Sequence, residues 1–210
     1  MTEKSDTKIK ILDAAEKLFG MNGFEATSLR DITAEAQVNL AAVNYHFQSK
    51  ESLIDAVIAR RVEPVNRHRM ELLDAAGENA SLEEVLRAFL QPVLDQDLSS
   101  VVPLLGRMMS DPAQFVERVY KKHFIAISQR IQEALHKQLP ECPRAELLWR
   151  THFLVGIMTH MMSWSQVLPG LTGGMCDVSD RQALVERIIA FASAGFRSPV
   201  PEPAAVEGKG

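Results

Sequence analysis

The sequence predicts an all-α protein with a small N-terminal head of three helices and a larger helical body, about nine helices in all. Apolar residues recur at intervals of three and four through most of the chain, as they do on one face of a helix. No segment alternates with period two for long enough to form a strand. Ser, Asn and Asp also stand repeatedly where these segments begin, which is typical of helix N-caps.

The first helix of the head is predicted by five apolar residues at helical spacing: Ile11, Leu12, Ala15, Leu18 and Phe19. Gly23 is expected to end this helix in the left-handed conformation, and Phe24 to plug the small core. A second helix begins after Thr27 or Ser28. Ser28 and Asp31 have the spacing of a capping box. The sequence therefore indicates both where the first helix ends and where the second begins.

The third helix is short, runs from Leu40 to Tyr45, and has Asn39 as its predicted N-cap. Small side chains keep this helix narrow, while Asn44, Tyr45 and His46 supply hydrogen-bonding groups. A slim helix with polar ends suits the major groove of B-DNA, which is about 12 Å wide and is read through amides and contacts to thymine methyls. Together with the second helix it indicates a helix-turn-helix.

The segment Ile11 to Ile54, with GFEATSLRDITAEAQVNLAAVNYHFQSKESL at its centre, resembles the N-terminal domain of the TetR family of bacterial transcriptional regulators. The resemblance covers about the first quarter of the chain and implies DNA binding. Two positions depart from the family pattern, with Gln37 where many members have Gly and Asn44 where many have Tyr. The tyrosine contact to phosphate then passes to Tyr45 or is replaced, so Asn44 is interpreted either as a reader of adenine or as a phosphate clamp.

The predicted DNA contacts combine the helix-turn-helix with basic residues on both sides of it: Lys8, Thr27, Ser28, Arg30, Asn39, Leu40, Ala41, Asn44, Tyr45, His46 and Lys50. Structural roles are the alternative for some of them. Asn39 can serve as an N-cap only, and Tyr45 and His46 can pack against Phe47.

The charge of the head is the main objection to DNA binding. Residues 1–47 contain five Lys and Arg against seven Asp and Glu, and the whole chain has a net charge of −4. For phosphate affinity, the positions of the individual charges matter more than the net charge, because electrostatic screening is strong beyond a Debye length of about 8 Å. Helix N-termini also present positive ends to phosphates without formal charge.

The expected domains are a DNA-binding head at residues 1–48, an effector-binding and dimerisation body at 49–198, and a disordered tail at 199–210 that is rich in Pro and Gly. No apolar run approaches the roughly 20 residues that span a bilayer, and the N-terminus has no secretory h-region. A cytoplasmic protein without a membrane partner is therefore expected. Cys142 and Cys176 have neither CxxC spacing nor a neighbouring His pair, which argues against a zinc site and a disulfide framework.

The body begins with a long fourth helix from Ser49 to about Gly77, which Pro64 should bend. Ser81 and Glu84 form a capping box for the fifth helix. A short helical piece is expected at residues 101–110.

Asp111 as N-cap and Pro112 as first residue predict a single seventh helix that continues to Leu135. The eighth helix is expected from Ala145 to about Gln166, followed by a glycine-rich loop with the sequence LPGLTGGM. Ser179 is the predicted cap of the ninth.

The resemblance implies that the last two long helices pair with those of a second subunit as a four-helix bundle. The residues support this independently, because the ninth helix combines small residues, Ala192, Ala194 and Gly195, with apolar residues on more than one face. Two recognition helices related by a twofold axis would read a palindromic DNA operator with half-sites about 34 Å apart.

Seven residues of the body are predicted to bind a small hydrophobic effector: Arg107, Met108, His123, Phe124, Phe153, His160 and Trp164. Methionine-rich walls adapt to flexible apolar ligands, and a cation facing them suits a carboxylate or phosphate. Ordinary core and dimer packing is the alternative. The strings VNLAAVNYHF and LLWRTHF also look like the TetR branch that responds to fatty acids or acyl thioesters, with efflux regulators that answer to hydrophobic drugs as the alternative.

The chain has no GxSxG, HExxH, GxGxxG or Walker pattern, so no catalytic residue, metal ligand or cofactor is predicted and an enzyme is not expected. A helical adaptor that does not bind DNA is the other class, favoured by the acidic head. The expected function is a ligand-responsive DNA-binding transcriptional regulator, a repressor released by its effector.

Overall fold

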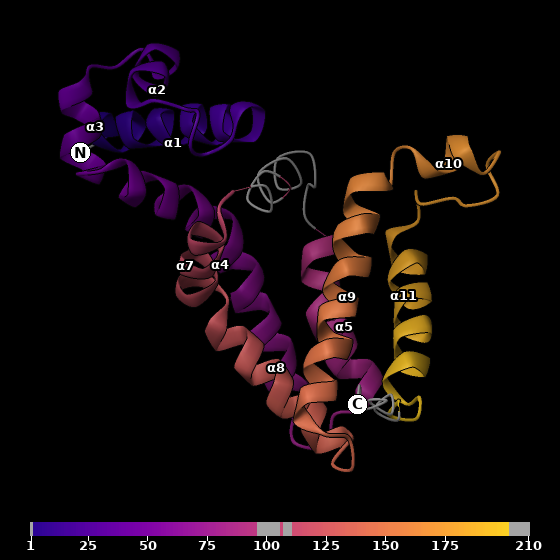
Figure 1. Ribbon diagram of the computed structural model, residues 1–210. Coiled ribbons are helices and arrows are strands. Elements are labelled where there is room, and N and C mark those ends of the chain that lie inside the picture. Colours follow the sequence, from indigo (N-terminus) through magenta and orange to yellow (C-terminus); the bar gives the residue numbers. More distant parts are fainter. Residues whose placement is uncertain (1, 96–105, 107–110, 202–210) are drawn as a thin grey trace, which may run out of the picture.

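The computed structural model describes residues 2–95, 106 and 111–201. Ten α-helices and no strand are present in this part of the chain, which confirms the predicted all-α class. Figure 1 shows a head of three helices joined by one long helix to a body of packed helices. In the described ranges, none of the helices combines the length and the hydrophobicity that a membrane-spanning segment needs.

The head consists of α1 (Thr2–Asn22), α2 (Leu29–Ala36) and α3 (Leu40–Phe47). The predicted capping box is confirmed, because Asp31 N–H donates to Ser28 Oγ at 3.2 Å and Ser28 N–H donates to Asp31 Oδ2 at 2.9 Å. Gly23 ends α1 with φ +90°, as predicted. Gln37, in the turn between α2 and α3, has φ 55°, a conformation that favours the Gly of the family pattern.

The long helix α4 (Lys50–Ala76) begins at the predicted cap, where Ser52 N–H donates to Ser49 Oγ at 3.1 Å. It contributes to two separate hydrophobic cores. Its buried residues up to Val62 belong to the core of the head, whereas those from Val65 onward belong to the core of the body. Pro64 lies inside the helix between the two sets. On α4 the change from one core to the other thus falls near Pro64, while the expected domain boundary at residue 48 stays a prediction.

The predicted seventh helix is two helices, α7 (Ala113–His123) and α8 (Ile125–Gln138), so the expectation of one continuous helix was wrong. The chain bends at Phe124, where φ is −120°, and Asn66 of α4 donates to the carbonyl of His123 at 2.8 Å. The predicted cap was also off by one residue, because Pro112 and not Asp111 occupies the N-cap position. The break lets α7 pack on the head while α8 packs on the body.

The body is completed by α5 (Leu82–Leu94), α9 (Arg144–Trp164) and α11 (Arg181–Phe196). Helix α5 packs on α4, α8 and α11, and α9 packs on α8 and α11, so that α11 lies on the side of the body away from α4 (Figure 1). The capping box of Ser81 and Glu84 is confirmed. The predicted loop after α9 contains one helical turn, α10 (Leu168–Leu171). Asp180 and not Ser179 caps α11, because the Asp180 carboxylate accepts from Ala183 N–H at 3.0 Å.

Arg150 of α9 fastens the end of the described chain to the body. Its side chain is 6% exposed, pairs with Glu146 at 2.8 Å, and donates to the carbonyls of Phe196 at 2.7 Å and Ser198 at 3.0 Å. The first residues after α11 are thus held by hydrogen bonds. The predicted helical piece at 101–110, apart from residue 106, and the tail from 202 onward lie outside the described residues.

Candidate DNA-binding surface and effector site

The third helix presents one face to solvent and buries the other. Val43 and Phe47 are 1% and 5% exposed and hold α3 in the core of the head. Leu40, Ala41, Asn44 and Tyr45 are exposed on the opposite side, and we call these four residues the recognition face. It offers an amide, a phenol and apolar groups, which are the side-chain types that read base edges and thymine methyls in the major groove.

The ends of α3 fulfil structural roles that the sequence left open. Asn39 Oδ1 accepts from Ala42 N–H at 2.8 Å, so this residue is an N-cap, and a contact from it to DNA stays a prediction. The half-buried His46 ring lies between those of Tyr45 and Phe47, with centroid distances of 5.1 and 6.1 Å. Packing therefore positions His46, whereas Tyr45 is 68% exposed.

Thr27 must be removed from the predicted DNA contacts. Its side chain is fully buried, and its hydroxyl donates to the carbonyl of Gly23 at 2.8 Å and lies 3.3 Å from the carbonyl of Leu18. The residue fixes the connection between α1 and α2, so its side chain cannot reach a phosphate. Burial of a hydroxyl with its hydrogen bonds made is a structural arrangement.

The basic residues expected near the phosphates lie at the surface of the head. Lys8 and Arg30 are exposed on α1 and α2. The Lys50 ammonium at the start of α4 donates to the carbonyl of Glu25 at 2.9 Å, which fixes its position. Ser28 is exposed, and its hydroxyl is used in the capping box.

Several acidic residues of the head are neutralised inside it. Asp13 and Glu16 of α1 pair with Arg60 and Arg61 of α4, with Arg61 Nε 2.8 Å from Glu16 Oε1. On the α2 side, Glu35 pairs with Lys17 at 2.6 Å. These carboxylates bind α1 to its neighbours, so the unfavourable net charge of the head overstates the repulsion that a phosphate backbone would meet.

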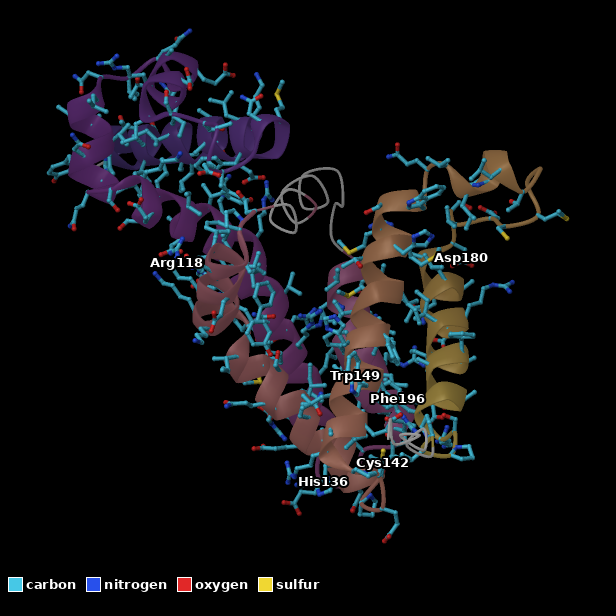
Figure 2. The ribbon with its side chains drawn as sticks, in the orientation of Figure 1. Arg118, His136, Cys142, Trp149, Asp180 and Phe196 are labelled. Atoms are coloured by element: carbon cyan, nitrogen blue, oxygen red, sulfur yellow. The ribbon has the colours of Figure 1, made fainter. Side chains whose placement is uncertain are left out.

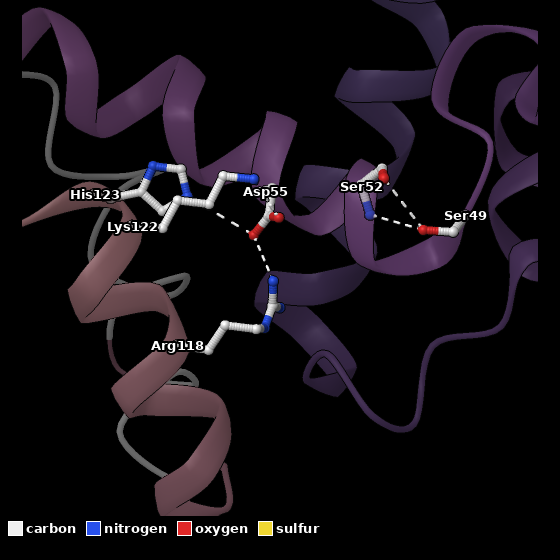
Figure 3. A network of polar contacts seen from close by, with 6 residues as sticks. All are labelled: Ser49, Ser52, Asp55, Arg118, Lys122 and His123. Atoms are coloured by element: carbon white, nitrogen blue, oxygen red, sulfur yellow. Dashed lines mark hydrogen bonds and ion pairs between the residues drawn. The ribbon is translucent and has the colours of Figure 1, made fainter.

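A charged cluster joins the upper part of α4 to α7 (Figure 3). Asp55 of α4 accepts from Arg118 at 2.8 Å and from Lys122 at 2.7 Å, and His123 Nε2 lies 3.7 Å from the same carboxylate. Burial opposes ionisation of Asp55, but the hydrogen bond from Lys122 and the charges of Arg118 and Lys122 bring its pKa below the ordinary value. Burial lowers the pKa of His123, and the nearby Asp55 carboxylate only partly offsets this.

The predicted effector residues do not meet in one place. His123 and Phe124 lie at the junction of α7 and α8. Phe153 and Trp164 are 60% and 44% exposed on the outer face of α9, where His160 stacks on Trp164 with a centroid distance of 5.3 Å. Arg107 and Met108 lie outside the described residues. The alternative of helix packing therefore fits Phe153, His160 and Trp164 better than a shared internal site.

A buried residue that the sequence analysis missed is Arg69 of α4, whose side chain is 4% exposed in the body. The signal was available, because Val65, Arg69 and Leu73 follow one another at intervals of four on the buried face of α4. Among the described residues, a shallow surface depression also occurs on α7, lined by Gln114, Glu117, Arg118, Lys121 and Lys122. Its charged walls do not suit an apolar ligand.

Comparisons with known proteins match both parts of the molecule. A family model described as bacterial regulatory proteins, tetR family, matches residues 11–57, and one described as tetracyclin repressor-like, C-terminal domain, matches residues 83–195. The probable HTH-type transcriptional regulator YttP of Bacillus subtilis is 34% identical over 92 residues, which is 44% of this chain and 42% of that protein. The HTH-type transcriptional regulator UidR of Escherichia coli is 27% identical over 139 residues, 65% of this chain and 70% of its own length.

Solved structures support the fold along almost the whole chain. The hemolysin II transcriptional regulator HlyIIR has a TM-score of 0.58 at 24% identity, with 90% of this chain and 97% of that chain covered. The TetR family transcriptional regulator PfmR from Thermus thermophilus has a TM-score of 0.56 at 18% identity, with 91% and 96% covered.

Proposed function

This chain belongs to the tetR family of bacterial regulatory proteins and is a DNA-binding transcriptional regulator, and from this premise we propose that it is a cytoplasmic repressor released from its operator by a hydrophobic effector. The operator is a palindrome, and the binding species is a homodimer. The observation that carries the proposal is the recognition face of α3, held rigidly by Val43 and Phe47.

DNA recognition follows from the placement of polar groups around this face. Asn44 is exposed at its centre, where a side-chain amide can form two hydrogen bonds with adenine. Leu40 and Ala41 are suited to thymine methyls. Lys8 and Lys50 flank the helix-turn-helix in the chain and supply charges for phosphates, which fix the register of the protein on the duplex.

Dimerisation is supported by apolar side chains left uncovered on α9 and α11. Trp149, Phe153 and Phe191 are 59%, 60% and 71% exposed, and Trp149 and Phe153 stack with a centroid distance of 6.0 Å. Gly156 and Gly195 lie on the same two helices and have open space beside them, which permits close helix approach. Contiguous exposed aromatic groups of this kind mark interaction surfaces, and a second copy would pair α9 and α11 with their counterparts.

The effector is a fatty acid or an acyl thioester in this proposal. The methionines of α9, Met158 and Met162, belong to the body core and can adapt to a flexible chain. A regulator of efflux that answers to cationic drugs is disfavoured by the positive charge of Arg69 in that same core. Release of DNA requires that the effector bind two arrangements of the heads unequally, and α4, which enters both cores, connects effector to head.

The test is a gel-shift titration with the DNA upstream of the gene for this chain, followed by footprinting of the bound site. Asn44→Ala should weaken binding by about 1–3 kcal/mol and relax base preference at one position of each half-site, if its amide contacts a base. Gln129→Ala, at an exposed amide of α8, is the matched control and should bind as the native chain does.

A native chain that shifts no DNA under any condition would favour the alternative of a helical adaptor. Unchanged affinity and unchanged base preference in Asn44→Ala would show that Asn44 does not read a base. Sedimentation of Phe153→Glu and Phe191→Glu tests the dimer, because both charges would be buried in the proposed interface.

A further inference from the structure

Arg69 is a buried cation that has only neutral partners among the described residues. Its Nε donates to the carbonyl of Phe89 at 2.9 Å, and Nη1 donates to Asn66 Oδ1 at 3.1 Å. The guanidinium lies 4.4 Å from the centroid of the Phe89 ring. Among the described residues its guanidinium donors contact the carbonyl of Phe89, the amide of Asn66 and the thioether of Met158, and no carboxylate pairs with it. Burial lowers the pKa of Arg69 to about 10, so the group still carries its charge at neutral pH.

Arg150, the other buried arginine in the described core, shows what a purely structural arginine looks like in this body. Its charge is matched by Glu146 at 2.8 Å, and its remaining donors are used by backbone carbonyls at the end of α11. Every feature of that site serves to fasten two helices. Arg69 lacks the matching acid, although a buried charge without a counterion is unfavourable.

The weakest contact of Arg69 shows where an anion would bind. Nη2 lies 3.9 Å from Met158 Sδ, and a thioether is a poor acceptor. A carboxylate accepts two hydrogen bonds from a guanidinium in a planar fork and neutralises its charge. Met158 is unbranched and flexible, so it can turn aside for such a ligand.

We propose that Arg69 binds the carboxylate of an amphiphilic effector, which displaces Met158 Sδ from Nη2 and extends its alkyl chain among the methionines of α9. This proposal rests on the proposed function and deepens it, because it names the residue and the charge that select the effector. Met158 and Met162 are buried in the body core, and Met161 and Met70 pack against it. The chain of the ligand would thus be surrounded by adaptable apolar side chains.

The position of Arg69 also explains how occupancy would reach the head. Asn66 accepts from Arg69 and donates to the carbonyl of His123, at the break between α7 and α8. His123 in turn lies beside Asp55, which belongs to the part of α4 that packs in the head (Figure 3). A carboxylate that reorients the guanidinium therefore disturbs the side-chain amide that joins α4 to this break.

The experiment compares three ligands that share a ten-carbon chain, each below its critical micelle concentration: decanoate, decan-1-ol and decyltrimethylammonium. Calorimetry with the full-length native chain should give decanoate at least tenfold tighter binding than decan-1-ol, and weaker binding still for the cation. Arg69→Met, which keeps the volume and removes the charge, should lose this tenfold preference and bind decan-1-ol as the native chain does. Decanoyl coenzyme A is the fourth arm and separates a free acid from an acyl thioester.

Arg130→Met is the matched control, because Arg130 is a surface arginine of α8 that pairs with Asp74 at 3.1 Å, and it should keep the full preference. Equal binding of decanoate and decan-1-ol to the native chain would overturn the proposal, as would undiminished decanoate binding by Arg69→Met. If Arg69→Met fails to fold, the ligand series on the native chain and on Arg69→Lys still decides, since Arg69→Lys keeps the charge and should keep part of the preference. A native chain that shifts DNA but binds no decyl compound refutes the Arg69 site alone, whereas one that shifts no DNA refutes the proposed function.

Discussion

The head and the body each bury a matched charge, Glu16 with Arg61 and Arg150 with Glu146, but the body also buries Arg69 without an acidic partner among the described residues. In the core of the head, the buried Glu16 is matched by Arg61 of α4. In the core of the body, the buried Arg69 has neutral partners only among the described residues. A core that only has to fold needs each buried charge matched, whereas an unmatched one is tolerated where a ligand supplies the counterion. The difference between head and body therefore lies at Arg69, where the proposed effector would supply the counterion.

The boundary between head and body is crossed by two chain segments, α4 and the segment α7–α8. Each of them packs in the head core on one side of the boundary and in the body core on the other. On α4, Val62 belongs to the head core and Val65 to the body core, with Pro64 between them. On the other segment, Val119 of α7 belongs to the head core and Ile127 of α8 to the body core, with the break at Phe124 between them. A single uninterrupted helix such as α4 can thus pack in two separate cores.

The largest expected effect comes from removing a large side chain from one core at a time. Phe19→Ala, in the head, should lower the free energy of unfolding by about 3–5 kcal/mol, because Phe19 is fully buried. Hydrogen exchange should rise in α1–α3, DNA binding should fall, and decanoate binding should remain. Leu90→Ala, in the body, should cost about 2–5 kcal/mol and produce the reverse pattern. If both variants exchange uniformly along the chain, the two cores form one cooperative unit and the comparison fails.

A smaller effect is expected from cutting the link between the regions. Asn66→Ala removes the hydrogen bonds to Arg69 and to the carbonyl of His123, and should cost about 1–3 kcal/mol. Both cores remain intact, so DNA binding without ligand should persist. Release of DNA by decanoate should instead require a higher ligand concentration. The measurement is a gel-shift competition, with Gln129→Ala as the control and unchanged release as the contrary outcome.

Acid should weaken the junction through His123. Burial lowers its folded-state pKa below the ordinary value of 6.5, despite the attraction of Asp55 and Glu63 and with a small added effect of Lys122. The unfolded chain therefore binds more protons as the pH falls below about 6.5, so stability declines in that range and is fully present above it. Thermal unfolding between pH 5 and 8 measures this slope. His123→Gln should flatten it, and His68→Gln, at an exposed histidine of α4, should not; equal slopes in the native chain and His123→Gln would contradict the assignment.

The sequence predicted the local structure better than the contacts between distant parts. Capping residues such as Ser28, Asn39, Ser49 and Ser81 bond within one turn, so the sequence alone identifies them. The break at Phe124 was missed because the donor that accompanies it, Asn66, is 57 residues away from His123. The helix propensities of the residues around Phe124 carry no information about a hydrogen-bond partner so distant in the sequence.

The candidate sites show the same contrast between features set by local sequence and features set by distant contacts. The polar residues of α3 were predicted as DNA contacts from their chemistry, and Asn44 and Tyr45 are exposed in the structure. Thr27, which precedes α2, was predicted as a contact too but is buried, because its hydroxyl faces the end of α1. In the body, aromatic residues of α9 were grouped with His123 by composition, yet they face outward (Figure 2 labels Trp149 on this helix). Arg69 was not predicted as a site residue, since an arginine in a long helix is ordinarily exposed, although Val65, Arg69 and Leu73 share one face of α4.

The smallest expected effect on stability concerns the basic residues that flank the recognition face. Lys8→Gln and Lys50→Gln should change the free energy of unfolding by less than about 0.5 kcal/mol, because Lys8 is exposed and Lys50 only contacts the carbonyl of Glu25. Their effect on DNA should appear in the salt dependence. If each contacts one phosphate, each substitution flattens the slope of log affinity against log salt by about one unit per subunit.

The native slope itself should correspond to about three or four phosphates per subunit, since the head contains few lysines and arginines and one of them, Lys17, is paired with Glu35. Lys137→Gln is the control, because Lys137 follows His136 at the end of α8 remote from the head (Figure 2), and it should leave the slope unchanged. A much steeper native slope would mean that further cations, Arg30 first among them, contact the backbone. A slope that neither Lys8→Gln nor Lys50→Gln alters would place both residues away from the DNA and leave the head to bind through helix N-termini and the recognition face, because those groups contact DNA without releasing counterions through a formal charge.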